Sequence, residues 1–279
     1  MISTFGKAFK TPDLRKKILF TLGIMALFRF GSVIPTPGVS YKNVQSCIDL
    51  AQNNGLFALV NMFSGGALLH LSVFALGIMP YITSSIIIQL LTVVIPRFEM
   101  LKQEGQSGTA KLTQYTRYLT IGLGILQSTG LIAVARIPRR LFTNCPYDII
   151  PAASWTRIVT MVFVMTAGTA VIMWLGELIT DRGIGNGMSI LIFTSIAAGF
   201  PGQLWSIQVQ NGFATFAFIL AVGVLIVAAV VFVENAQRRI PVQYAKRMVG
   251  RQMYGGTSTY IPIKVNQAGV IPVIFASSL

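Results

Sequence analysis

Residues 71–95 of this 279-residue chain read LSVFALGIMPYITSSIIIQLLTVVI, a run without any acidic or basic side chain. An α-helix rises about 1.5 Å per residue, so roughly 20 apolar residues cross the ~30 Å hydrocarbon core of a bilayer, and this run is long enough to do so. The whole chain is 53% hydrophobic and only 11% charged, which is too apolar for one core surrounded by water. The sequence therefore predicts a membrane-embedded protein.

Further apolar runs lie on either side of this one. They cover residues 18–34, 118–134, 155–179, 188–200 and 213–233. Another begins at Asn266 and is unbroken at Leu279, so we expect the start of a further helix and a chain that continues. The predicted fold class is an all-α polytopic membrane protein with six complete transmembrane helices plus the start of a seventh. The first run is followed by Pro35, Thr36 and Pro37, which argues against a cleavable signal peptide.

The basic residues predict how these helices are oriented. If all six runs cross, most of the 22 Lys and Arg residues fall on one side of the membrane, and the positive-inside rule identifies that side as cytoplasmic. The amino terminus and the loop 235–265 are then inside, while a basic cluster at 136–140 lies outside and argues against this topology. The net charge of +14 therefore reports orientation and does not by itself indicate nucleic-acid binding.

The two cysteines, Cys47 and Cys145, fall on the outer face in this topology. A disulfide is permitted there if the compartment is oxidising. Two cysteines without distance information say little about pairing, and we therefore expect unpaired thiols.

The connection between the first two runs is far longer than the 2 to 8 residues typical of helix connections. Apolar residues near its end flank Ser64, Gly65 and Gly66, and the only histidine, His70, follows. Broken backbone at membrane depth is tolerated only where it is buried in protein or faces a water-filled cavity. Two interpretations remain open: a re-entrant segment beside a cavity, or an apolar loop on the membrane surface.

The fifth run, residues 188–200, rises only about 20 Å as a helix and is short for a bilayer. A polar, glycine-rich stretch at 183–187 precedes it. This stretch is either an irregular helix start inside a vestibule or a plain loop before a short tilted helix.

The loop 235–265 carries six basic residues and no acidic one. Apolar residues alternate on both sides of Gly255 and Gly256, which predicts a loose hairpin projecting into the cytosol. Orientation alone explains its charge but not its length, and we therefore favour a docking surface.

The sequence shows no motif typical of an enzyme active site. The sequence has no HExxH, Gly-x-Ser-x-Gly or phosphate-loop motif, and one histidine with two outward cysteines predicts no metal or cofactor site. Ion-coupled transporters place ionisable residues near the midplane. Glu177 and Glu234 instead lie at span ends, and Arg29 is either a structural or interfacial residue or snorkels outward. An intramembrane enzyme and a secondary transporter are therefore disfavoured.

Several strings along the whole chain carry a family resemblance. They are Arg29-Phe30-Gly31, Ile34-Pro35-Thr36-Pro37-Gly38, Asn61-Met62-Phe63-Ser64-Gly65-Gly66, Leu76-Gly77-Ile78-Met79-Pro80-Tyr81-Ile82, Ile86-Ile87-Ile88-Gln89-Leu90-Leu91, Trp174-Leu175-Gly176-Glu177, Arg182-Gly183-Ile184-Gly185-Asn186-Gly187 and Val265-Asn266-Gln267-Ala268-Gly269-Val270-Ile271-Pro272. In these strings the chain resembles the SecY family of protein-conducting channels.

This resemblance implies ten spans in two pseudo-symmetric halves, with a pore between them and a lateral gate towards lipid. Residues 1–200 would form the amino-terminal half, with helices 1–5 and a plug, a short helix that blocks the outer funnel, at about 61–71. Residues 201–279 would start the carboxy-terminal half, with helix 6, the loop 235–265 and the start of helix 7.

The resemblance also implies site residues. The plug motif is Asn61, Met62, Phe63, Ser64, Gly65 and Gly66. The apolar pore ring would contain Ile78, Ile82, Met188, Ile192 and Ile274, where Met188 departs from the isoleucine common in the family. The lateral-gate residues would be Gln127 and Asn266. The ribosome or motor docking residues would be Arg238, Arg239, Lys246, Arg247 and Arg251. Independently of the family, Ile78/Ile82 and Met188/Ile192 are i, i+4 pairs on one helix face.

The implied activity is passive. Unfolded secretory proteins would cross the bacterial plasma (inner) membrane, and membrane proteins would pass sideways into it, driven by a SecA-like ATPase or a translating ribosome with its ribosomal RNA. Small subunits like SecE and SecG, signal peptides, nascent chains and membrane lipids are the other expected partners, with no cofactor. The amino terminus would be cytoplasmic.

Overall fold

The computed structural model describes residues 11–50, 64–137, 147–151, 154–243, 247–249, 252–254 and 258–266. The chain divides into two compact units, one formed by residues 1–202 with 277–279 and the other by residues 203–276. Helices dominate both, so the predicted all-α class is confirmed apart from a hairpin in the second unit.

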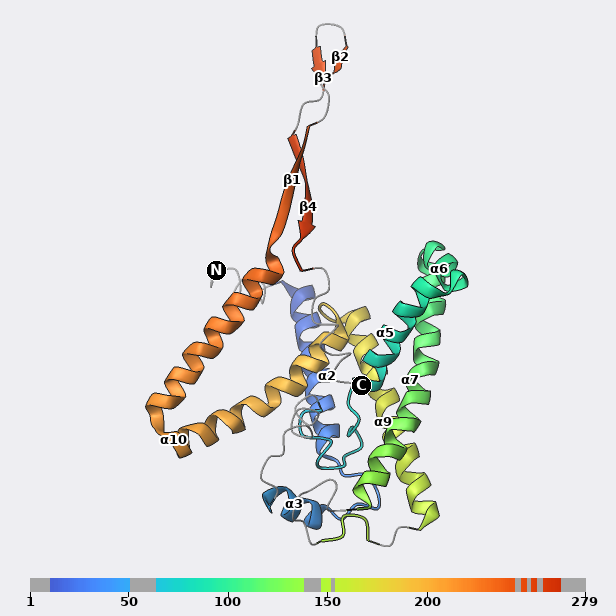
Figure 1. The fold of residues 1–279 in the computed structure, drawn as a ribbon, viewed down its shortest axis with the longest axis vertical. Coiled ribbons are helices and arrows are strands. Elements are labelled where there is room, and N and C mark those ends of the chain that lie inside the picture. Colours follow the sequence, from blue (N-terminus) through green and yellow to red (C-terminus); the bar gives the residue numbers. More distant parts are fainter. Residues whose placement is uncertain are drawn as a thin grey trace. The chain divides into compact units, whose positions relative to one another are not determined.

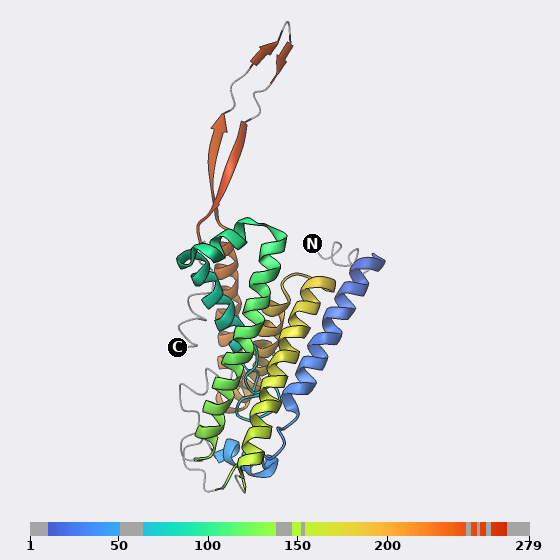
Figure 2. The same ribbon diagram turned by 90° about the vertical axis from the view of Figure 1, so that its right-hand side faces the viewer.

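The first unit is a helical bundle (Figures 1 and 2). Its helices are α2 (Pro12–Val33), α3 (Tyr41–Leu50), α5 (Met79–Val94), α6 (Pro96–Gln103), α7 (Gln106–Ala135), α9 (Trp155–Arg182) and the start of α10 (Gly187–Asn235). Helix α7 packs between α5 and α9, and α9 also contacts α2. Figure 2 shows α2, α7 and α9 as long rods side by side. Proline in the first turn of α2, α5 and α6 suits these starts, because the first N–H groups of a helix need no intrahelical partner.

Two apolar clusters form the core of this bundle. One contains Val44, Leu71, Ile132, Ile149 and Met161, and it joins α3 and the segment 147–151 to α7 and α9. The other contains Ile24, Phe28, Phe74, Ile78, Ile172, Leu175, Ile179 and Leu191, and it joins α2, α9 and the starts of α5 and α10.

Three described helical segments are long and apolar enough to cross a membrane, by length and composition. They are Gln106–Ala135, Trp155–Arg182 and Ile207–Asn235, and the bent pair α5–α6 makes a fourth if it counts as one span. The two helices α5 and α6 are bent by 101° relative to one another. The six predicted spans agree in position with α2, α5, α7, α9 and the two parts of α10, but their number stays a prediction.

The run 71–95 is not one helix, contrary to the prediction. Residues 64–78 form irregular turns, and helix begins only at Met79. The backbone N–H of Val73 donates to Ile34 O at 2.9 Å, and that of Thr36 donates to Leu71 O at 3.1 Å. These bonds tie the run to the end of α2, and Leu71 adopts a left-handed φ of 46°, so a helix cannot begin there.

The stretch before the fifth run is a plain turn followed directly by a helix. The N–H of Met188 donates to the Asn186 side-chain oxygen at 3.0 Å, which caps α10. Helix α10 does not end at Phe200 but continues into the second unit, where Gly212 interrupts it with a φ of 80°. The exposed apolar segment Ile207–Asn235 lies around and beyond this break.

The predicted hairpin in the loop 235–265 is confirmed, but its turn lies elsewhere. Strand β1 (Gln237–Gln243) pairs antiparallel with β4 (Ser258–Lys264), and β2 (Arg247–Val249) pairs with β3 (Gln252–Tyr254). Both ladders share one register, in which Val249 pairs with Gln252, so the chain reverses between these two residues. The sequence pattern had favoured Gly255 and Gly256, which fall between β3 and β4. Figure 1 shows the hairpin extending from the end of α10.

The expectation of an unpaired thiol is wrong for Cys47, which is disulfide-bonded. The physical reason is the packing of α3 on the segment 147–151. Ser40 N donates to Ile149 O at 3.1 Å, Asn43 Nδ2 donates to Asp148 O at 2.8 Å, and Val44 and Cys47 are wholly buried beside them. One face of α3 is thus held against the chain that follows Cys145.

The chain has only two cysteines, so we predict that Cys47 is bonded to Cys145, which lies outside the described residues. Peptide mapping of the unreduced protein should yield one linked peptide containing both. Alkylation before reduction should label neither, whereas labelling of both thiols would contradict the prediction.

Candidate functional site

The described part of the predicted plug motif begins at Ser64, and residues 64–71 form turns and not the predicted short plug helix. Asn61, Met62 and Phe63 lie outside the described residues. Ser64 is buried, and its hydroxyl accepts a hydrogen bond from Leu68 N at 3.1 Å. Gly65 and Gly66 adopt φ values of 65° and 89°, a left-handed conformation that favours glycine. The glycines therefore do more than interrupt an apolar run, because the observed path requires them.

The start of α5 carries the first pair of predicted ring residues. The backbone N–H of Ile82 donates to Ile78 O at 3.2 Å, so the two side chains lie one helical turn apart. Ile78 is almost fully buried, whereas Ile82 is half-buried. This geometry fits the predicted shared face.

The start of α10 carries the second pair, Met188 and Ile192, both half-buried. The Thr180 hydroxyl positions this helix, because it accepts from Gly187 N at 2.9 Å while donating to Gly176 O at 3.0 Å. A Cβ at Gly176 would collide with Met188 Sδ, and one at Gly187 would collide with the Gly176 carbonyl. The missing side chains of both glycines thus let α10 begin directly against α9.

The structure brings four of the five predicted ring residues together. Ile78 belongs to the second apolar cluster, and Ile82, Met188 and Ile192 pack against it. The fifth, Ile274, lies outside the described residues. Their sealing role stays a prediction, while their proximity is an observation.

The predicted plug segment lies beside these four predicted ring residues. A Cβ at Gly77 would lie 3.6 Å from Ser64 Cα, and one at Gly65 would lie 3.2 Å from Ser195 Cα. Gly77 immediately precedes Ile78, and Ser195 follows Ile192 in α10. Backbone contacts therefore connect the start of the plug motif to both ring helices.

Arg29 of α2 does not snorkel away from this site. Its Nη1 donates to Gly65 O at 2.6 Å, across 36 positions of sequence. Sequence reasoning missed this contact because no local pattern indicates it.

His70 lies at the opposite end of the plug turn from Gly65. Its ring stacks on Tyr41 of α3 at 6.5 Å between ring centroids, and its Nδ1 is buried without a hydrogen-bond partner among the described residues. Burial, and secondarily the positive charge of Arg29, lowers the pKa of His70 below its ordinary value. The neutral ring is therefore the form that fits the packed segment.

Glu177 is held in a fork by Arg117. Arg117 Nε and Nη2 donate to the two carboxylate oxygens at 2.9 and 2.8 Å, joining α7 to α9. The bidentate geometry fixes the two helices laterally. An ion pair between neighbouring helices accounts for Glu177 without any proton-coupling role.

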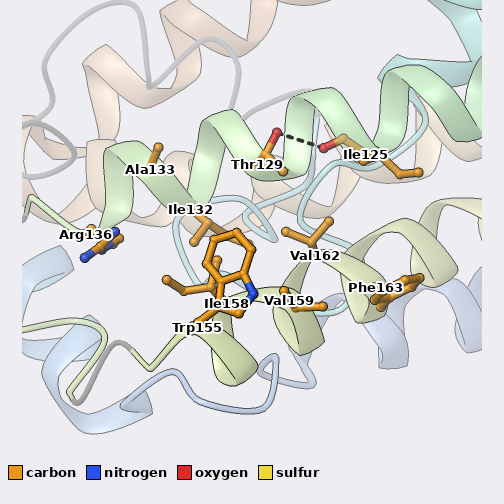
Figure 3. A pocket seen from close by; sticks show the side chains of 10 residues that line it. All are labelled: Ile125, Thr129, Ile132, Ala133, Arg136, Trp155, Ile158, Val159, Val162 and Phe163. Atoms are coloured by element: carbon orange, nitrogen blue, oxygen red, sulfur yellow. Dashed lines mark hydrogen bonds between the residues drawn. The ribbon is translucent and has the colours of Figure 1, made fainter.

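A groove of about 330 Å³ lies on the α7 and α9 side of the bundle (Figure 3). Its lining is apolar apart from Thr129 and Arg136. Trp155, at the first position of α9, is strongly exposed at its edge. Trp is enriched at the membrane–water interface, where its amphipathic ring sits at the level of the lipid headgroups.

The remaining predicted residues lie apart from this site in the sequence. Gln127 is half-buried in α7, and Asn266 donates to Glu234 at 3.1 Å at the base of the hairpin. Arg238 and Arg239 are exposed in β1, and Arg239 lies 4.7 Å over the Tyr260 ring. Arg247 is in β2, whereas Lys246 and Arg251 lie outside the described residues.

The lowered pKa of His70 predicts a pH dependence. The packed state favours neutral His70, so its contribution to stability is present above the ordinary value of 6.5 and is lost as pH falls below it towards the lowered pKa. Acidification from pH 7.5 to 5.5 should lower the Tm of the wild-type protein more than that of His70→Gln. Because His70 is the only histidine, equal shifts in the two proteins would contradict this assignment.

Comparison with known proteins places these features in a family. The SecY family model matches residues 72–279. The protein translocase subunit SecY of Streptomyces scabiei is 68% identical over 286 aligned residues, which cover 100% of this chain and 65% of the relative. The chain thus spans 65% of the length of that curated relative.

Two solved structures share the fold. Sec61 in the canine ribosome–channel complex from the endoplasmic reticulum gives a TM-score of 0.58 at 17% identity, covering 94% of this chain and 56% of that one. A structure of a SecY protein whose plug domain is described as stabilising the closed translocation channel gives 0.57 at 18% identity, covering 94% and 55%. Since the family model covers most of the chain and the relative covers all of it, the chain belongs to the SecY family.

Proposed function

We propose that this chain supplies the amino-terminal part of a protein-conducting channel that passes unfolded polypeptides across a bacterial plasma membrane and membrane proteins sideways into it. The observation that carries the proposal is the common apolar cluster of Ile78, Ile82, Met188 and Ile192, contributed by two helix starts and adjoining the plug segment. An apolar constriction blocks ions by dewetting yet offers no specific bond to a passing chain. Such a ring suits a passive conduit.

The plug proposal rests on the irregular segment 64–78. Its turns lie inside the bundle, held by bonds to the end of α2 and by packing against α10. This burial favours the re-entrant interpretation over an apolar surface loop. The structural relative named for its plug domain supports the same role, in which residues 61–71 close the outer funnel.

The disulfide at Cys47 supports the proposed orientation. Disulfides persist in oxidising compartments, so the loop after α2 would face outward, and the amino terminus, one crossing earlier, would be cytoplasmic. The basic loop 235–265 would be cytoplasmic by the same parity, in agreement with the positive-inside rule.

The hairpin is the proposed docking surface for the driving machinery. Arg238 and Arg239 are consecutive in β1 and therefore point to opposite faces of the strand, which offers positive charge on both sides. A ribosome, through its RNA, or a SecA-like ATPase would bind here; Sec61 was solved in a ribosome–channel complex. SecE-like and SecG-like subunits would brace the two halves, which meet near residue 200.

The chain itself would perform no catalysis. The motor or ribosome would supply the energy, and no cofactor or metal would be needed. The lateral gate would use Gln127 and Asn266, where interhelical hydrogen bonds worth about 0.6 kcal/mol each would be weak enough to open.

The ring proposal predicts an ion leak. In the complete channel, Ile82→Asn or Ile192→Asn should raise resting ion conductance in planar bilayers and relax signal-sequence stringency, because an amide wets the constriction. Ile87→Asn in the same helix is the matched control, since Ile87 is outside the cluster, and it should stay closed. Wild-type leak from both ring variants would refute the seal.

The docking proposal predicts a salt-dependent partner. Exchange of Arg238, Arg239 and Arg251 to Glu should leave the channel inserted but abolish ribosome or motor binding in co-sedimentation, and wild-type affinity should fall steeply along a salt series. Lys264→Glu, at a residue that pairs with Gln237 and is not among the predicted docking residues, controls for charge reversal and should have a smaller effect. If the triple variant kept wild-type affinity at low salt, the hairpin would serve orientation alone.

A further inference from the structure

Arg29 is a cation within an otherwise uncharged stretch of α2, since residues 18–33 contain no other charged side chain. Such a charge inside a membrane span is costly unless it reaches water or a polar partner. Its guanidinium is partly exposed and donates to the Gly65 carbonyl at 2.6 Å. The partner is therefore not a counter-ion on a neighbouring helix but the backbone of the plug segment.

Gly65 is confined on its other side by α10. A Cβ built at Gly65 would lie 3.2 Å from both Cα and O of Ser195, and 3.4 Å from Arg29 Nη1. Ser195 is buried, and its hydroxyl is already engaged by the Leu191 carbonyl at 3.0 Å. The backbone at Gly65 thus passes through a slot between α2 and α10, where a Cβ would require a neighbouring atom to shift by a few tenths of an ångström and would be strained by the left-handed φ of 65°.

We infer that Arg29 is the positioning residue that latches the plug in the closed channel. The inference rests on the proposed channel function and adds a residue that controls closure. The guanidinium draws the Gly65 carbonyl into the slot, and the backbone of α10 blocks escape on the other side. Separation of α10 from α2 would open the slot and release the plug.

A hydrogen bond from a charged donor to a neutral carbonyl suits a reversible latch. The bond is stronger than one between neutral groups, because the donor is ionised. When the plug leaves, the exposed guanidinium can be solvated by water instead of being left as an unpaired buried charge. Opening therefore does not leave the charge of Arg29 buried without a partner.

The test uses the complete channel with its partner subunits, in planar bilayers and by hydrogen exchange. Arg29→Met, which keeps bulk but removes the donors, should increase resting channel openings by roughly ten- to a hundredfold, as expected for loss of a hydrogen bond to a charged group. Amide protons of residues 64–72 should exchange faster while α9 stays protected. Arg29→Lys, which keeps a charged donor, should restore most of the closure.

Arg136→Met is the matched control, because Arg136 is exposed at the end of α7, and it should behave as wild type. Gly65→Ala adds a Cβ to the plug backbone where it passes between α2 and α10 and leaves Arg29 intact. It should reproduce the Arg29→Met phenotype. Wild-type closure and wild-type exchange in both Arg29→Met and Gly65→Ala would overturn the latch. Equal openings in Arg29→Lys and Arg29→Met would also overturn it.

Failure of the proposed function would look different. In that case the wild-type complex would neither translocate a secretory substrate nor show openings that any variant changes. If only the latch inference is wrong, the wild-type complex translocates its substrate and the Arg29 variants stay as closed as the wild type. The exchange measurement reports the packing of residues 64–72 in either case.

Discussion

Lipid offers no hydrogen bonds to a polypeptide, so every backbone group at membrane depth must find its partner within the protein. Residues 64–78 are the part of this chain for which that constraint is hardest to meet, because they are irregular. Backbone bonds to Ile34 and Thr36, the hydroxyl of Ser64 and the guanidinium of Arg29 supply partners that a helix would have supplied internally. The surrounding helices must therefore enclose this segment, and the bundle is built around it.

Helices can pack this closely around residues 64–78 only where glycine leaves no side chain at the point of contact. A Cβ at Gly31 would collide with the Phe74 ring, and one at Gly168 would collide with the Val73 carbonyl. Small residues serve this purpose in membrane proteins, where packing and hydrogen bonds, not expulsion of water, hold helices together. The same device at Gly176 and Gly187 sets Met188 against α9. The irregular segment thus depends on Gly31 and Gly168, and the position of Met188 in the apolar cluster depends on Gly176 and Gly187.

Local sequence pattern predicted the elements better than their ends or their partners. Apolar run length located α7 and α9, and alternation located the hairpin.

The break in the run 71–95 was missed because it results from pairing with residues 34–36, which lies beyond any local window. The hairpin turn was misplaced at Gly255 and Gly256, because the observed pairing of Val249 with Gln252 puts the reversal before these glycines. Spacing alone gave two i, i+4 pairs, and only the family resemblance joined them into one ring. The disulfide at Cys47 and the partner of Arg29 depend on tertiary packing, which no motif encodes.

Two features that rest on different physical effects bear on the proposed orientation of the chain in the membrane. Positive charge retained on one side reflects the cost of moving Lys and Arg across the membrane, whereas a disulfide reflects the redox chemistry of the compartment it faces. They concern different residues, since Cys47 is in α3, which follows α2, and the basic strand β1 follows α10. The basic cluster at 136–140 would lie outside the cell in this orientation, against the positive-inside rule. It does not affect the argument from the disulfide. Because the disulfide argument needs only one proposed crossing, that of α2, to orient the amino terminus, it would be the stronger of the two constraints, and the charge distribution would extend the proposed orientation to the hairpin.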